Sequence, residues 1–350
     1  MKILIIQQKM IGDVLTSSIM FEALKKKYPD SELHYVINSH TYPVVERNPF
    51  IDKFIFVTPE IENSLLKFYS FLKSIKKEKY DTIIDVYGCL SSNLITYFSK
   101  SKIRISYHKK NTSFLYTNSI KRLIHPEKNN CLAIENRMRL LLPLKIAFKN
   151  IAPKIYLQQH ELDSAKIVLE SFNISLSKPL FMISVLGSKP SKTYPPKYMA
   201  QLIDEIILEK PNAQILFNYI PNQKVEAREI YNLCTSKTRE NLFFDVYAKS
   251  LRESLGIISH CNAIIGNEGG AINIGKALNI PSFCIFSPHI GKQNWFCKKE
   301  NSIDVAVHIS DFLNFTKIDK AKSKKQYNAY YLKMKPEYII PELQKFLKKL

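Results

Sequence analysis

The chain opens with a short apolar run and continues into a helical pattern. Residues 3–6 are all aliphatic and predict a buried strand, and residues 12–29 carry apolar side chains at the spacing of an amphipathic helix. Strand and helix patterns then alternate through the first half, with strands expected at 32–37, 53–57, 82–86 and 103–106, and helices at 63–77 and 89–99. Strands separated by helices favour βαβ units and a parallel sheet.

This alternation breaks between residues 125 and 160 and resumes at a second apolar run, 180–185. We therefore expect an α/β protein with two Rossmann-like domains, at residues 1–165 and 166–335. A C-terminal helix at 336–350 follows them and could pack back on the first domain. A length of 350 residues suits two domains of ordinary size. The second domain is expected to hold helices at 162–172, 196–209, 224–234, 250–259 and 271–278, and strands at 180–185, 214–218, 263–266 and 282–286.

Composition narrows the class of protein and the compartment. No stretch approaches 18 consecutive apolar residues, and the four-residue aliphatic start is too short for a signal peptide. The six cysteines, at 89, 131, 234, 261, 284 and 297, show no C-x-x-C spacing, which favours reduced thiols over a disulfide framework or a zinc site. We expect a cytoplasmic protein without a transmembrane span.

The chain is strongly basic. Its formal charge of +20 indicates an anionic partner, such as nucleic acid, a membrane surface or a phosphorylated substrate. Residues 99–128 hold eight Lys or Arg against one acidic residue, with aromatic side chains between them. This segment is either a solvated surface or a binding surface for a phosphorylated lipid.

An acidic residue follows the first predicted strand. Gly12 and Asp13 fall at its carboxyl end, where ligands bind in open α/β sheets. The Asp13 carboxylate could act only as a helix cap, because negative charge is favoured at a helix start. It could equally serve chemistry, if a ligand-binding turn exists elsewhere in the chain.

Such a turn is indicated between residues 263 and 286. Four of the nine glycines fall within 266–275, in a pattern of strand, glycine turn, helix, Pro281 and strand. Glycines let backbone amides approach a ligand, and free amides at a helix start favour phosphate oxygens. Tight packing of helix on sheet is the alternative reason for the same glycines.

A third candidate segment is the loop that follows the strand 180–185. Lys189 and Lys192 could neutralise a diphosphate there, and Ser188 could donate a hydrogen bond to it. The first turn lacks G-x-G-x-x-G, and G-x-x-x-x-G-K-[ST] is absent, which argues against a dinucleotide dehydrogenase and a P-loop ATPase. There is no D-x-D motif and no cluster of His and Asp, so we expect no metal site and no cofactor.

Three segments together resemble glycosyltransferase family 9, the ADP-heptose:lipopolysaccharide heptosyltransferases. The opening 2–29 (K-I-L-I-I-x6-G-D-V-L-x8-A-L-K-K-K-Y-P) is similar to the family's N-terminus. Residues 267–281 (N-E-G-G-A-I-N-I-G-K-A-L-N-I-P) lie in register with its N-D-S-G-P-x-H-x-A-x-A-L-x-x-P motif, and 192–195 (K-T-Y-P) resembles its K-x-W-P. The segments come in family order, while residues 60–175 match only in their α/β alternation.

The resemblance implies a GT-B architecture, two Rossmann-like domains facing an interdomain cleft, and an inverting transfer of a heptose or related sugar. By position, Asp13 would be the catalytic base and Lys192 a ligand of the donor diphosphate, and the nucleotide sugar, ADP-heptose, would be the co-substrate. The acceptor would be a lipopolysaccharide core or related anionic glycolipid at the inner membrane surface, with the enzyme cytoplasmic or peripheral. The donor site would be lined by Glu268, Gly269, Gly270, Ala271 and Asn273, with the Gly269–Ala271 amides stabilising the leaving diphosphate.

The chain departs from the family pattern at three positions. Glu268 stands where the family has Asp, Asn273 where it has His, and Tyr194 where it has Trp. Two other functions are compatible with the residues: a GT-B nucleotide-sugar 2-epimerase, and a basic nucleic-acid-binding protein. The scatter of lysines and the lack of a nucleic-acid module disfavour the second.

Overall fold

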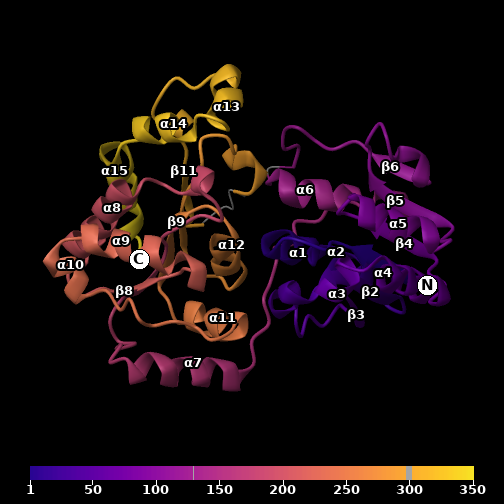
Figure 1. Ribbon diagram of the computed structural model, residues 1–350, viewed down its shortest axis with the longest axis horizontal. Coiled ribbons are helices and arrows are strands. Elements are labelled where there is room, and N and C mark those ends of the chain that lie inside the picture. Colours follow the sequence, from indigo (N-terminus) through magenta and orange to yellow (C-terminus); the bar gives the residue numbers. More distant parts are fainter. Residues whose placement is uncertain (129, 297–301) are drawn as a thin grey trace. The chain divides into compact units, whose positions relative to one another are not determined.

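The computed structural model describes residues 1–128, 130–296 and 302–350, and it divides into two compact units. The first unit spans Met1–Tyr156 and the second Leu157–Leu350 (Figure 1). The division falls before the predicted boundary at residue 165 because helix α7 (Gln159–Ser171) packs on α11 (Leu251–Ser259) of the second unit. An ion pair of Arg252 with Glu161 joins these two helices.

The first unit is built on a parallel sheet of six strands in the order β3-β2-β1-β4-β5-β6. The direction in which successive strands are added reverses between β1 and β4. The carboxyl edge of the sheet at β1 is therefore a topological switch point, where ligands bind in such sheets. The strands are β1 (Lys2–Ile6), β2 (Glu32–Asn38), β3 (Lys53–Val57), β4 (Thr82–Asp85), β5 (Ile103–Tyr107) and β6 (Asn118–Ile120).

The crossover helices of the first unit cover the sheet. Aliphatic side chains of β1 pack against the buried sides of α4 and α5 in one continuous core. These helices bury one side only, so their hydrophobic residues recur at helical spacing. The helices are α1 (Ile11–Ser17), α2 (Ile19–Lys27), α3 (Pro59–Glu62), α4 (Leu65–Lys77), α5 (Leu90–Phe98) and α6 (Leu132–Arg139).

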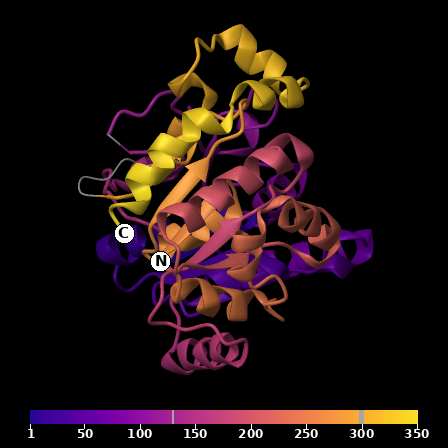
Figure 2. The ribbon, with the colours of Figure 1, turned by 90° about the vertical axis from the view of Figure 1, so that its left-hand side faces the viewer.

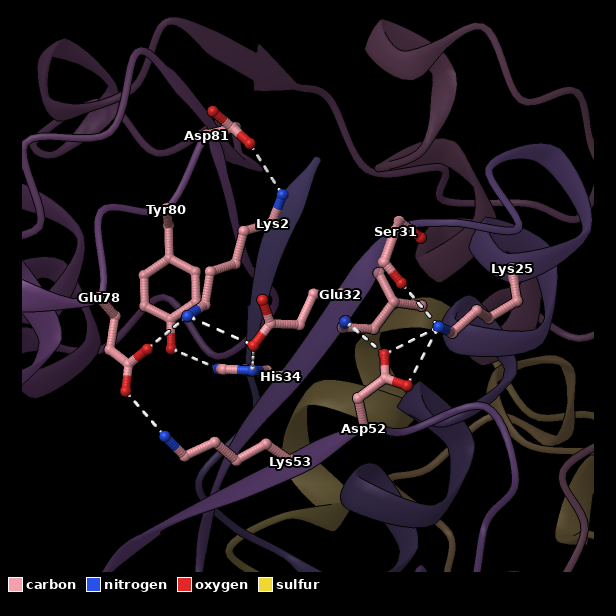
Figure 3. Close-up of polar contacts among 11 residues, drawn as sticks. Lys2, Lys25, Ser31, Glu32, His34, Asp52, Lys53, Glu78, Tyr80 and Asp81 are labelled. Atoms are coloured by element: carbon pink, nitrogen blue, oxygen red, sulfur yellow. Dashed lines mark hydrogen bonds and ion pairs between the residues drawn. The ribbon is translucent and has the colours of Figure 1, made fainter.

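Charges at the amino edge of this sheet are neutralised in pairs. Glu78 accepts from Lys2 and, at 2.7 Å, from Lys53 (Figure 3). The buried His34 contacts the Tyr80 hydroxyl through Nδ1 at 2.8 Å and Glu32 through Nε2 at 2.7 Å. This edge lies opposite the carboxyl ends of the strands, and its polar groups serve the fold.

The second unit is built on a parallel sheet of five strands in the order β11-β10-β9-β7-β8. Here the reversal lies between β7 and β9, so the carboxyl ends of these two strands mark its ligand edge. The strands are β7 (Leu180–Ser184), β8 (Gln214–Phe217), β9 (Ala263–Asn267), β10 (Ser282–Ile285) and β11 (Val305–Val307).

The C-terminal helix completes the core of the second unit. Figure 2 shows α15 (yellow) lying along this unit's sheet, and its side chains Ile339, Leu343, Phe346 and Leu347 are fully buried in the core. The apolar side of α15 was expected to pack on the first domain, but it packs on Phe283 and on the helix α8 (Pro196–Glu209) of the second unit. The remaining helices are α8 (Pro196–Glu209), α9 (Lys224–Leu233), α10 (Ser236–Glu240), α12 (Gly270–Ala277), α13 (Lys317–Ser323), α14 (Tyr327–Lys333) and α15 (Pro336–Leu347).

The cysteines agree only in part with the expectation of reduced thiols. Cys89, Cys234, Cys261 and Cys284 are free, and burial raises the pKa of the last three of these thiols. Cys131 is disulfide-bonded, contrary to the expectation. Cys297 lies outside the described residues.

Candidate functional site

Asp13 lies at the switch point of the first sheet. Helix α1 begins at Ile11, directly after the loop that follows β1, and Asp13 is in its first turn. The N-cap residue is Met10, and the cap makes no side-chain hydrogen bond, so Asp13 does not cap the helix in the usual way. Its side chain remains one-third exposed, which leaves a carboxylate open to a ligand.

A buried arginine fixes the Asp13 carboxylate. The Arg137 guanidinium, from α6, donates through Nη2 to Asp13 Oδ1 at 2.8 Å. The same side chain donates through Nε to Ser17 Oγ and through Nη1 to the Ala133 carbonyl, each at 2.8 Å. The contacts with Ser17 and Ala133 fix the planar guanidinium, which orients the carboxylate through Oδ1, while Oδ2 accepts no hydrogen bond within the described residues.

Aromatic side chains border this pair. Tyr35 is fully buried and its hydroxyl donates to the Val14 carbonyl at 2.9 Å. Burial raises the pKa of Tyr107, against the lowering effect of Arg137 and Arg122, so the phenol stays neutral. Arg122, which belongs to the basic segment 99–128, lies over the Tyr107 ring at 3.9 Å from its centroid. The basic segment therefore reaches the surroundings of Asp13.

In the second unit, two glycines of the glycine turn are packed closely against neighbouring atoms, and two face open space. A Cβ at Gly266 would lie 2.4 Å from the Ser184 carbonyl oxygen, and one at Gly275 would lie 2.5 Å from the Ile264 side chain. Gly269 and Gly270 would meet nothing within 4 Å. Packing therefore explains the first two glycines, and the open space above Gly269 and Gly270 is where a ligand could approach the start of α12.

Glu268 and Lys192 form an ion pair beside this turn. Lys192 Nζ lies 2.9 Å from Glu268 Oε1, and the Glu268 side chain is 7% exposed. Glu268 Oε1 accepts no hydrogen bond within the described residues, so its contact with Lys192 is an ion pair without a well-formed hydrogen bond. Lys192 keeps donors available for another anion.

Asn267 holds the two strand ends and the lysine loop together. Its Nδ2 donates to the carbonyls of Ser184 and Val185, and its Oδ1 accepts from the Tyr194 backbone amide at 2.7 Å. The Tyr194 side chain is buried, and its hydroxyl donates to the Met334 carbonyl at 2.6 Å. Tyr194 is thus a core residue, and it positions the loop that carries Lys192.

The other predicted residues surround the same edge. Ser188 and Lys189 are exposed in the loop before the short 3₁₀ turn η4 (Pro190–Lys192), and Ala271 and Asn273 are partly exposed in the first turns of α12. Gly12 and Asp13 belong to the first unit, and all other predicted site residues belong to the second.

Sequence reasoning missed several polar residues near Glu268. Of the nine buried side-chain atoms without a hydrogen-bond partner in the described part of the chain, three belong to the second unit besides Glu268 Oε1: Ser287 Oγ, His289 Nδ1 and Tyr331 OH. Burial raises the pKa of Tyr331, and the Glu268 charge raises it further. Burial also lowers the pKa of His289, and the positive charges of Lys192, Lys189 and Lys324 lower it further. Buried polar atoms are hydrogen-bonded in nearly all proteins, so water or a bound ligand could supply partners for these three.

The described residues hold no group of three or more His, Cys, Asp or Glu side chains placed to bind a metal ion. Among their helices, none has the length and apolar character needed to cross a bilayer.

The fold is that of the GT-B glycosyltransferases. Two solved structures share it over the full chain: glycosyl transferase family 9 from Veillonella parvula DSM 2008, with a TM-score of 0.82, and E. coli ADP-heptose lps heptosyltransferase II, with 0.73. Each is 17% identical in sequence, and this chain covers 98% and 99% of their lengths. These values establish the fold alone.

Sequence comparison establishes the family. The profile of glycosyltransferase family 9 (heptosyltransferase) matches residues 68–324, so the chain belongs to that family and is a glycosyltransferase. Lipopolysaccharide heptosyltransferase 1 of Campylobacter coli is 24% identical over 324 residues, covering 91% of this chain and 94% of the relative. Membership favours sugar transfer over the epimerase and nucleic-acid-binding alternatives.

Proposed function

We propose that the protein transfers a heptose, or a related sugar, from ADP-heptose to a lipopolysaccharide core or similar glycolipid, with inversion at the anomeric carbon. The observation that carries this proposal is the Lys192–Glu268 ion pair, which lies directly before the open glycines Gly269 and Gly270 at the start of α12. The printed names of the relatives support the sugar and the acceptor class.

The donor diphosphate would bind at the start of α12. The amides of Gly269–Ala271 lie at a helix N-terminus, which favours phosphate oxygens, and Lys192, paired with Glu268 beside the turn, would add a cation. Ser188 and Lys189 could contact the same phosphates from their exposed loop. The Glu268 carboxylate and the Asn273 amide offer acceptor and donor atoms to sugar hydroxyls. Fixed positive groups of this kind stabilise the charge of a departing diphosphate.

Asp13 would act as the base. As the acceptor hydroxyl oxygen attacks the anomeric carbon, its proton passes to the Asp13 carboxylate, and the bond from that carbon to the diphosphate oxygen breaks. The leaving ADP keeps the bonding electron pair. Arg137 holds the carboxylate in one orientation and presents its free oxygen to the hydroxyl. The reaction requires Asp13 and the donor corner to act on the same sugar during turnover.

The acceptor would be anionic and lipid-linked, which places the enzyme at the inner membrane surface. The Arg122 guanidinium, over the Tyr107 ring, would supply matching charge near Asp13, and the lysines of the segment 99–128 would add to the positive charge of the first unit.

The test is transfer of sugar from ADP-heptose to a heptose-free lipopolysaccharide acceptor, followed by mass analysis of the product. We expect Asp13→Asn to lower turnover by at least about a thousandfold with donor affinity unchanged, because only the proton acceptor is removed. Asp30→Asn, at an exposed acid of the same unit, is the matched control and should behave as wild type. Near-normal turnover of Asp13→Asn would exclude the proposed base.

A further inference from the structure

The helix α4 carries an apolar surface that the fold does not use. Leu65 and Leu66, its first two residues, are 89% and 81% exposed, and Tyr69 is 48% exposed one turn further on. The opposite side of α4 is packed in the core of the first unit through Phe71, Leu72 and Ile75. The outer leucines therefore gain nothing from folding, and adjacent exposed leucines usually mark a contact surface.

The rest of this outer side is cationic. Lys67, Lys73, Lys76 and Lys77 are all exposed, and Lys73 Nζ lies 4.6 Å from the centre of the Tyr69 ring. At 100° per residue, Leu66, Tyr69, Lys73 and Lys77 fall on one side of the helix. Of the acids that flank the helix, Glu62 is paired with Lys9, and Glu78 is paired with Lys2 and Lys53. The exposed Glu60 lies near Lys67, but Lys73, Lys76 and Lys77 form no ion pair within the described residues. The surface thus combines two leucines with three lysines whose charge is not neutralised.

The leucines lie at the same edge of the first unit as Asp13. An ion pair at 2.7 Å joins Lys9, in the loop between β1 and α1, to Glu62, the last residue of α3. Ser64 then caps α4 by accepting from the Lys67 amide, so Leu65 and Leu66 begin the helix beside that loop. In a parallel α/β unit, crossover helices start at the carboxyl edge of the sheet, which is where α1 presents Asp13.

We propose that the outer side of α4 docks the first unit on an anionic phospholipid surface. Leu65, Leu66 and Tyr69 enter the interface between head groups and acyl chains, and the lysines contact lipid phosphates. A second copy of the chain fits this surface poorly, because it would bring two lysine-rich sides together on molecules that each carry a formal charge of +20. The purpose of the docking rests on the proposed function, since a lipid-linked acceptor would then be presented beside Asp13.

The experiment measures co-sedimentation of the full chain with vesicles of phosphatidylcholine, with and without about 30% phosphatidylglycerol. We expect wild type to bind the anionic vesicles, and Leu65→Ser/Leu66→Ser to lower the partition coefficient by at least about tenfold. Lys73→Gln/Lys76→Gln/Lys77→Gln should remove most of the preference for anionic lipid. The matched control is Leu208→Ser/Val225→Ser, at side chains of the second unit that are 66% and 81% exposed, and it should bind as wild type.

Three outcomes would overturn the docking proposal: no binding of wild type to either vesicle, unchanged binding of Leu65→Ser/Leu66→Ser, or a wild-type dimer in light scattering that this variant dissociates. A water-soluble acceptor without acyl chains separates docking from catalysis. Leu65→Ser/Leu66→Ser should transfer sugar to it at the wild-type rate. If wild type transfers no sugar but its binding depends on the two leucines, the proposed function fails and the docking surface stands.

Discussion

Arg137 Nη2 donates to Asp13 Oδ1 at 2.8 Å, and the two residues are 124 positions apart in the chain. The arginine is almost fully buried and the carboxylate is one-third exposed. The pair therefore joins a buried guanidinium to a carboxylate at the surface of the first unit.

Replacing Arg137 by lysine should impair the proposed base without removing it. A lysine cannot hold Ser17, the Ala133 carbonyl and Asp13 with one fixed plane, so the carboxylate loses its orientation. We expect turnover of Arg137→Lys to fall by about ten- to a hundredfold with donor KM unchanged, and the free energy of unfolding to fall by about 1–3 kcal/mol. Arg139→Lys, on the same helix, is the control in rate and urea-unfolding measurements. Wild-type turnover in Arg137→Lys would show that Asp13 needs no such support.

Variants of the Lys192–Glu268 pair should separate an effect on the unfolding free energy from an effect on donor affinity. Lys192→Met leaves a buried carboxylate without its cation, which should cost about 1–3 kcal/mol of unfolding free energy. It should also raise donor KM by more than about tenfold. Lys192→Met/Glu268→Gln should recover the stability and not the KM, and Lys197→Met, an exposed lysine at the start of α8, should change neither. If the double variant also regains donor affinity, Lys192 does not bind the diphosphate.

The glycine turn allows a test with two alanine substitutions. Gly266 has a φ of +129° and a Cβ there would meet the Ser184 carbonyl, so Gly266→Ala should lose more than about 2 kcal/mol of unfolding free energy. Gly270→Ala has space and sits at the first position of α12, so its stability should change by less than about 1 kcal/mol. Its donor affinity should nevertheless fall by about tenfold or more. Calorimetric titration with the nucleotide sugar measures this affinity. If Gly270 served packing alone, the donor affinity of Gly270→Ala would equal that of wild type.

Two buried tyrosines give opposite expectations. The Tyr331 hydroxyl makes no well-formed hydrogen bond within the described residues, and only a weak interaction with the nearby Ser287 hydroxyl lowers its pKa, so Tyr331→Phe should change the unfolding free energy by less than about 1 kcal/mol. The Tyr194 hydroxyl donates to the Met334 carbonyl at 2.6 Å, so Tyr194→Phe should lose about 1–2 kcal/mol. Only Tyr331→Phe should weaken donor binding in a thermal-shift series. Equal donor affinity in Tyr331→Phe and wild type would remove this hydroxyl from the site.

The amino edge of the first sheet predicts sensitivity to acid. Burial lowers the pKa of His34 below its ordinary value of about 6.5, so the unfolded chain takes up a proton first as pH falls. The hydrogen bonds from Lys2 and Lys53 lower the pKa of Glu78 to about 2, so its contribution to stability is present above its ordinary pKa and is lost as pH falls toward 2.

We therefore expect the unfolding free energy to decrease below about pH 6.5 through His34 and to decrease again below about pH 4.5 through Glu78. His34→Gln should reduce the first step in urea unfolding followed against pH, to which the lowered pKa values of His289 and His308 also contribute, and it should leave the second. A wild-type profile that is flat between pH 7 and pH 5 would contradict the assignment to His34.

The sequence allowed the regular parts of the fold to be predicted because they are long and apolar. The strands at β1, β2, β3 and β7 and the helix α8 follow from aliphatic runs and helical spacing. The three-residue strands β6 and β11 were missed, since Asn118–Ile120 carries two polar residues and lies partly exposed. Such short strands are set by their neighbours in the sheet and not by their own composition.

The same contrast applies to the candidate site. Asp13, Lys192 and Glu268 stand in motifs, so spacing within the chain was enough to select them. Arg137 comes from a helix whose pattern shows only that it is amphipathic, and Ser287 and Tyr331 lie after a strand and on a late helix without any motif. Their importance depends on contacts between distant segments, which a single sequence does not display.

The burial of α15 in the second unit sets an order for synthesis of the chain. Phe346 and Leu347 of α15 fill the core of the second unit, whereas the first unit is complete at Tyr156. On the ribosome, the first unit can fold while the remainder is still being made. The second unit must wait until α15 has left the ribosome, and until then it exposes an unfinished apolar face for which chaperones would compete.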